Sequence, residues 1–154
     1  MDNSVTIIGA VITALMGIPL YMVFRSNSLK KSEIKKIMSQ FPQYHFDETE
    51  TQNKRVYALD TKNKAFMLID FNHKPEMVFV ENLSNATACR IVPTTEGRAQ
   101  NIVKIEFEFQ FKDGKKELVP CYDAAHDQIT QVCLFEDQEL AKKWQKKIIL
   151  SLAV

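Results

Sequence analysis

The longest uncharged run of the chain constrains its fold more than any other feature. Residues 5–24, VTIIGAVITALMGIPLYMVF, contain no Asp, Glu, Lys or Arg. At about 1.5 Å per residue, a helix of this length spans roughly 30 Å, the thickness of the hydrocarbon core of a bilayer. A cleaved signal peptide would have a basic start and a shorter apolar run, and a buried helix of a globular domain would keep a polar face. The sequence therefore predicts a transmembrane helix over residues 5–24.

The charges on either side of this run predict its orientation. Arg25 and four lysines follow it within residues 25–36, whereas Asp2 is the one charged side chain ahead of it. Lysine and arginine next to a span favour the cytoplasmic side. We therefore expect a single-pass membrane protein, with residues 1–4 outside and the rest of the chain after residue 24 in the cytoplasm.

Small residues recur along one side of the predicted span. Gly9, Thr13 and Gly17 are spaced four apart, and small residues at this spacing let two membrane helices approach closely. This face predicts a homo-oligomer or docking to another span. The alternative is that Gly is simply common in membrane helices.

Residues 25–42 are expected to form a basic amphipathic helix next to the membrane. Apolar residues between Leu29 and Phe41 share one helical face, and Pro42 ends the pattern. Such a helix can lie on anionic lipid, or it can pack on the following domain with its lysines in water. The candidate lipid contacts of this segment are Lys30, Lys31, Lys35 and Lys36.

Residues 43–154 change to the period of two that is typical of strands. Val103–Phe111 alternates apolar and polar residues, and Asp113-Gly114 follows it as a hairpin turn. A C-terminal helix is expected from Asp137 as its N-cap, with an apolar stripe of Leu140, Trp144 and Ile148. The other strands are predicted at residues 55–60, 65–71, 78–80, 86–92, 117–122 and 129–134.

This order of elements resembles the pleckstrin-homology (PH-like) superfold. The resemblance is carried by Val56–Asp60, Asn63–Asp70, Phe79–Leu83 and Trp144, and the chain is similar to small membrane-anchored PH-like proteins of bacteria and phages. It implies an N-terminal transmembrane helix attached to an α+β domain. That domain would be an antiparallel β-sandwich or barrel of six or seven strands, closed by the C-terminal amphipathic helix. The transmembrane helix would anchor it to a bacterial inner membrane, with the domain in the cytoplasm.

The resemblance also suggests anionic lipid as a ligand. Lipid-binding PH-like domains carry basic residues at their first hairpin, and Lys54, Arg55, Lys62 and Lys64 lie near it here. The full basic motif of those domains is absent. We therefore treat these residues as candidate lipid contacts, with a solvated loop as the alternative.

Catalytic and metal-binding patterns are sparse. His45, His73 and His126 are scattered without metal-ligand spacing. Cys121 and His126 form the best candidate for a nucleophile–base pair, with a strand end followed by a turn as the alternative. A net charge of +1 gives no field that would favour nucleic acid. We expect no enzyme activity, no metal, no cofactor and no nucleic-acid partner.

These patterns predict a membrane-tethered, non-enzymatic adaptor or scaffold. Its domain would bind a cytoplasmic or membrane protein partner at an open strand edge or in a groove beside the helix. Two alternatives remain. One is a domain that senses anionic lipid, and the other is a subunit of a larger membrane complex that assembles through Gly9, Thr13 and Gly17.

Overall fold

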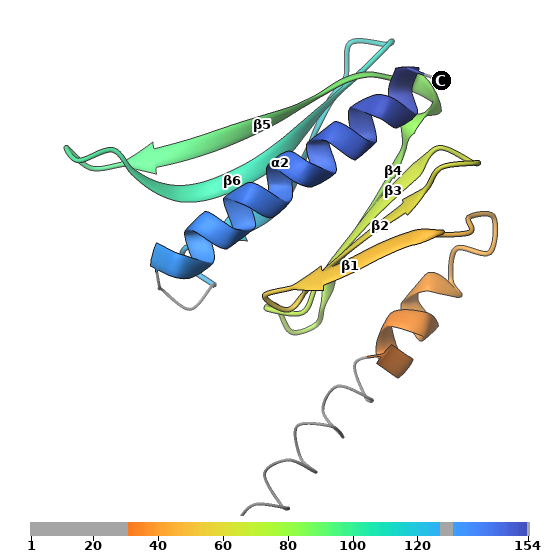
Figure 1. Ribbon diagram of the computed structural model, residues 1–154, viewed down its shortest axis with the longest axis horizontal. Helices are drawn as coiled ribbons and strands as arrows, with labels where there is room; N and C mark the ends of the chain where they lie inside the picture. The colour runs from red at the N-terminus through yellow and green to blue at the C-terminus, as the bar shows by residue number, and fades with distance from the viewer. Residues whose placement is uncertain (1–30, 127–130, 154) are drawn as a thin grey trace, which may run out of the picture. The chain divides into compact units, whose positions relative to one another are not determined.

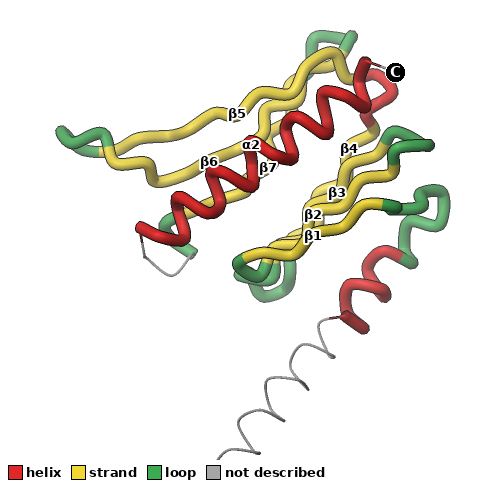
Figure 2. The backbone as a smooth tube through the Cα atoms, in the orientation of Figure 1, coloured by secondary structure: helices red, strands yellow, loops and turns green. Residues whose placement is uncertain are grey.

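The computed structural model describes residues 31–126 and 131–153 of the chain (Figure 1). The chain divides into two compact units, Met1–Pro42 and Gln43–Val154. In the first unit, residues 31–38 are helical. The second unit contains two antiparallel sheets and a long C-terminal helix, which Figure 2 distinguishes by colour.

The first sheet has four strands in sequence order, β1 (Glu48–Gln52), β2 (Arg55–Asp60), β3 (Ala65–Asp70) and β4 (Met77–Asn82). The turn between β2 and β3 is organised by the Asp60 carboxylate. It accepts hydrogen bonds from the backbone N–H groups of Asn63 and His45, at 2.8 and 2.6 Å. These contacts help to hold the hairpin in a register that places Tyr57 opposite Leu68.

The second sheet follows a short 3-10 turn, η1 (Leu83–Asn85), which connects the two sheets. It consists of β5 (Ala86–Glu96), β6 (Asn101–Phe111) and β7 (Lys116–Asp123), again in sequence order. Gly114 adopts a φ of +83° in the turn between β6 and β7. A residue with a Cβ rarely adopts this conformation, so the Asp-Gly turn in the sequence has a direct backbone reason.

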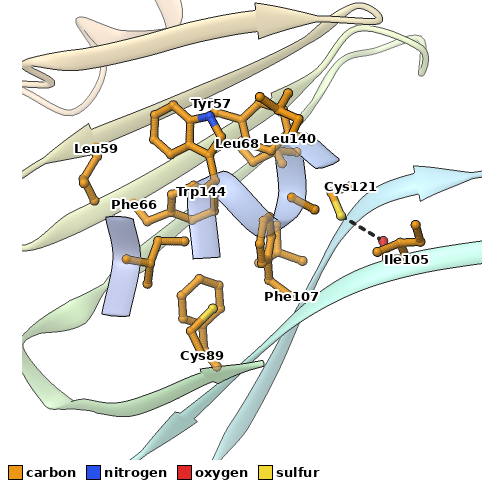
Figure 3. Close-up of a cluster of buried hydrophobic side chains, with 14 of the residues drawn as sticks. Tyr57, Leu59, Phe66, Leu68, Cys89, Ile105, Phe107, Cys121, Leu140 and Trp144 are labelled. Atoms are coloured by element: carbon orange, nitrogen blue, oxygen red, sulfur yellow. Dashed lines mark hydrogen bonds between the residues drawn. The ribbon is translucent and has the colours of Figure 1, made fainter. Parts of the chain in front are cut away.

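The C-terminal helix α2 (Gln131–Ala153) packs with both sheets around one core (Figure 3). Trp144 is fully buried at its centre, stacked on Tyr57 with ring centroids 5.6 Å apart and tilted against Phe66 at 6.3 Å. Such aromatic pairs add about 1 kcal/mol each beyond the area they bury. The apolar core is completed by Leu59, Leu68, Leu83, Ala86, Cys89, Ile105, Phe107, Phe109, Val119, Cys121, Tyr122, Leu140, Ala141 and Ile148.

A network of buried charges ties the first sheet to α2. Arg55 is 1% exposed, and its Nε donates to Asp70 Oδ2 at 2.9 Å. Its Nη1 lies 3.8 Å from Oδ2 of Asp137, which is buried within α2. The other carboxylate oxygen of Asp137 accepts from Asn53 Nδ2 at 2.7 Å and from Gln52 Nε2 at 3.3 Å. One arginine therefore links β2, β3 and the helix.

Several local predictions are confirmed, and two are wrong. The β2–β3 hairpin lies where the sequence placed it, and the alternating run Val103–Phe111 lies within β6. The strand predicted at residues 129–134 is wrong, because α2 already begins at Gln131. Asp137 is not an N-cap, because it lies inside α2 and bonds to the turn between β1 and β2.

The predicted fold class requires a correction. The sequence suggested a transmembrane helix followed by a PH-like sandwich or barrel of six or seven strands. The described residues instead form separate sheets of four and three strands, together with the helix at residues 31–38 and α2. No ladder joins the two sheets among these residues, so they do not close into a barrel.

The membrane prediction is corrected as well. Within residues 31–126 and 131–153, no helix combines the length and the apolar character needed to cross a membrane. The helix α2 has 23 residues, but lysines, glutamates and Asp137 interrupt its apolar positions. We therefore withdraw the assignment as a single-pass inner-membrane protein with a cytoplasmic domain. The predicted span, residues 5–24, lies outside the described residues.

The Arg55 network generates a stability prediction. Replacement Arg55→Met leaves Asp70 and Asp137 buried without this cation, so we expect a loss of about 3–5 kcal/mol in the free energy of unfolding. Urea denaturation monitored by Trp144 fluorescence measures it. The control is Lys142→Met, because the ion pair of Lys142 with Glu139 is exposed and is worth about 0–1 kcal/mol. Equal losses in the two variants would contradict the assigned role of Arg55.

Candidate functional site

Side chains of the outer strand β1 bond to α2. The Lys143 ammonium lies 2.8 Å from the Glu50 carboxylate, and Trp144 Nε1 donates to the same carboxylate at 3.0 Å. Lys147 bonds to Glu48 one turn further along and also lies over the Trp144 ring. Glu48 and Glu50 are alternate residues of β1, so one face of this strand is turned toward α2.

The outer strand β5 has no ladder partner on its outer side among the described residues. Pro93 within β5 fits this position, because proline has no N–H to donate to a neighbouring strand. A groove with a volume of about 350 Å³ runs between β5 and the C-terminal part of α2. It is lined by Thr87, Ala88, Cys89, Arg90, Ile149, Leu152 and Ala153.

This groove combines a strand edge with an apolar wall. Gln145 Nε2 donates to the Cys89 carbonyl at 3.1 Å, so this carbonyl points away from β6 toward the helix. Burial raises the pKa of the Cys89 thiol to about 12, which keeps it a neutral thiol that behaves as a small apolar group. Ile149 remains 44% exposed on the helix side. The β5–α2 groove can therefore offer backbone hydrogen bonds and apolar contacts together.

The strands β4 and β7 form the remaining sheet edges. Neither has a ladder partner on its outer side within the described part of the chain. Met77, Val78 and Leu118 are exposed large hydrophobic residues on these two strands. A pocket with a volume of about 500 Å³ lies between the end of β4 and the β6–β7 turn, lined by Glu81, Asn82, Asn85, Phe111, Lys112, Asp113, Lys115 and Glu117.

Glu81 is the electrostatically unusual residue of this pocket. It lies opposite Phe66 in the β3–β4 ladder, and Phe66 belongs to the core, so Glu81 is on the inward face of an edge strand. Burial, and then the charge of Glu117, raise the pKa of its carboxyl group to about 7. No ion pair of Glu81 or Glu117 is formed among the described residues.

Two histidines from the loops that follow β3 and β7 lie next to each other. The rings of His73 and His126 have centroids 4.1 Å apart. His73 Nε2 lies 3.8 Å from Asp70 Oδ2, and His126 Nδ1 lies 3.3 Å from Asp123 Oδ2. Burial opposes ionisation of Asp123, but bonds from Ala125 N–H and His126 hold its pKa below the usual range. Among the described residues, no group of three or more His, Cys, Asp or Glu is arranged to hold a metal ion.

The candidate nucleophile Cys121 is not activated. It is completely buried, and its Sγ donates to the Ile105 carbonyl at 3.3 Å (Figure 3). Burial raises the pKa of this thiol to about 12. His126 instead faces Asp123 and the His73 ring. The structure therefore does not assemble the thiolate–imidazolium pair that the sequence raised as a candidate.

The basic residues near the first hairpin do not form one surface. Arg55 is buried in its ion pairs, so it is not available to a lipid headgroup. Lys54 precedes β2, whereas Lys62 and Lys64 lie at the other end of that strand, in the β2–β3 turn. These residues are therefore separated by the length of β2.

The candidate residues of the N-terminal unit are only partly described. Lys31, Lys35 and Lys36 are exposed on the helix at residues 31–38. The other candidates, Lys30 and the face of Gly9, Thr13 and Gly17, lie outside the described residues.

Comparison of the chain with protein-family models, with curated proteins and with solved structures finds no match. The resemblance to PH-like proteins therefore has no support from these comparisons.

Glu81 generates a pH-dependent stability prediction. The pKa of Glu81 is about 7 in the folded protein, against an ordinary value of 4.5. The folded protein therefore binds this proton more tightly than the unfolded chain does. Stability should therefore fall as the pH rises through this interval, with the full penalty above it. We expect Glu81→Gln to be more stable than the wild type by about 1 kcal/mol near pH 8, after a discount for partial exposure. The two should be equally stable near pH 4.

Thermal unfolding across this pH range tests the prediction. The matched control is Glu117→Gln, which removes the second cause of the shift and should move the upper end of the interval to lower pH. A constant difference between Glu81→Gln and the wild type at every pH would show that Glu81 does not titrate in this way.

Proposed function

We propose that this protein is a non-enzymatic interaction module of the adaptor type. In this proposal, an extended segment of a partner protein binds in the β5–α2 groove and adds a strand to the second sheet. The observation that supports the proposal most directly is the position of α2. The helix packs beside the outer strand β5 and leaves apolar side chains next to that edge.

Binding of an added strand depends on two kinds of contact. Backbone hydrogen bonds to the edge supply affinity, and pockets for alternate side chains supply specificity. The 11 residues of β5 extend over roughly 36 Å at the rise typical of a strand. Ile149 and Leu152 give one wall of the groove an apolar surface for side chains of the bound segment.

The groove also indicates which segments bind best. Arg90 lines it, no ion pair of Arg90 is formed among the described residues, and no acidic residue lines the groove. An acidic residue of the partner near Arg90 would gain a charge-assisted hydrogen bond. The Gln145 amide already occupies the Cys89 carbonyl, so the partner must either displace it or bond to other groups of the edge. The preferred partner is therefore an extended segment that combines apolar and acidic residues.

Selection of a random peptide library on the full chain tests this proposal. Selected peptides should shift the backbone amide resonances of residues 87–91, and Ile149→Asp should weaken their binding by about tenfold or more, as expected for a residue in the centre of an interface. Leu150→Asp is the matched control, because Leu150 is the next residue, is 69% exposed and does not line the groove. Peptides that bind Ile149→Asp as well as the wild type, or that shift other amides, would rule out the groove.

A further inference from the structure

The edge of β4 and its neighbouring pocket form a surface separate from the β5–α2 groove. The two surfaces share no lining residue. Strand β4 presents unpaired backbone groups on its outer side within the described part of the chain. Its exposed Met77 and Val78 add apolar surface to this edge. The surface thus has the components that an added strand requires.

In the pocket at the end of β4, the carboxylates of Glu81 and Glu117 form no ion pair among the described residues, although two lysines also line the pocket. Glu81 lies on the core-facing side of β4, and Glu117 is close enough to raise its pKa further. Lys112 and Lys115 belong to the β6–β7 turn, and neither forms an ion pair with Glu81 or Glu117. A carboxylate that is partly removed from water gains most from a cation that hydrogen-bonds to it directly.

A protective role for Glu81 is the competing explanation. An inward-pointing charge on an edge strand discourages other strands from pairing with that edge. Protection alone would require neither a second carboxylate beside Glu81 nor a pocket of about 500 Å³ next to it. The two roles predict opposite effects of neutralising Glu81, because a docking carboxylate attracts its partner and a protective one repels it.

We propose that the β4 edge docks an extended basic segment of a second partner protein, whose lysine or arginine side chain enters the pocket between Glu81 and Glu117. The backbone of this segment pairs with β4, and its cation forms ion pairs with the carboxylates of Glu81 and Glu117. This goes beyond the proposed function, because a domain with two separate strand edges can hold two different partners at once. Charge also distinguishes the sites, since the β5–α2 groove favours acidic segments and the β4 pocket favours basic ones.

A titration of the isotopically labelled full chain tests this proposal. The probe is a hexapeptide of alternating valine and lysine, and the control is its valine–glutamate counterpart. We expect the lysine peptide to shift the amide resonances of residues 77–82 and the glutamate peptide to leave them unchanged. Binding should weaken by about tenfold in Glu81→Gln or Glu117→Gln. It should also weaken when the pH falls below the Glu81 pKa of about 7, because the neutral acid no longer attracts a cation.

Three results would overturn the proposal. The first is equal or tighter binding of the lysine peptide to Glu81→Gln, which is the outcome of a protective role. The second is equal binding of the lysine and glutamate peptides. The third is the absence of shifts at residues 77–82. Ile149→Asp should bind the lysine peptide as the wild type does, so failure of the β5–α2 groove and failure of the β4 pocket are distinguishable.

Discussion

The burial of Arg55 is the constraint on which the rest of the domain depends. A guanidinium that is 1% exposed is tolerated only if carboxylates and hydrogen bonds compensate for the water it has lost. Asp70 supplies one of these from β3 and Asp137 supplies the other from α2. The same charge therefore links α2 to the first sheet at Asp137. Trp144, two turns further along α2, is then placed against Tyr57 in the core.

The position of α2 decides what surrounds the outer strands of the two sheets. Its lysines and Trp144 bond to Glu48 and Glu50, so the helix is joined to one face of β1. On its other side the helix borders β5 and provides the apolar wall of the β5–α2 groove. It does not line the pocket beside β4, where Glu81 and the β6–β7 turn determine the chemistry. The placement of this one helix thus sets the surroundings of β1 and β5, whereas the pocket beside β4 is formed without it.

The agreement between sequence and structure follows the range of the interactions involved. The β2–β3 hairpin and β6 were predictable, because alternation and turn residues act within a few positions. Strand β1, with the sequence ETETQ, has no apolar alternation that would predict a strand. Its glutamates form ion pairs with lysines of α2, which are far away in the sequence. Asp137 resembled an N-cap by composition, but its partner Asn53 lies 84 residues away. The membrane assignment was drawn from the uncharged run and the charges on either side of it, and no helix of the described residues could cross a membrane.

The sequence by itself determined the repeat of apolar residues, which is every second residue in the strands and every third or fourth in the C-terminal helix. It also determined the Asp-Gly turn, where Gly114 has a positive φ. These depend on the backbone and nearest neighbours. The tertiary structure alone decided which strands lie beside α2, why Asp137 is buried, and why Cys121 is an inert thiol. It also decided that Glu81 lies half-buried near the charge of Glu117. Burial and charge pairing depend on residues far apart in the sequence, and no local pattern specifies them.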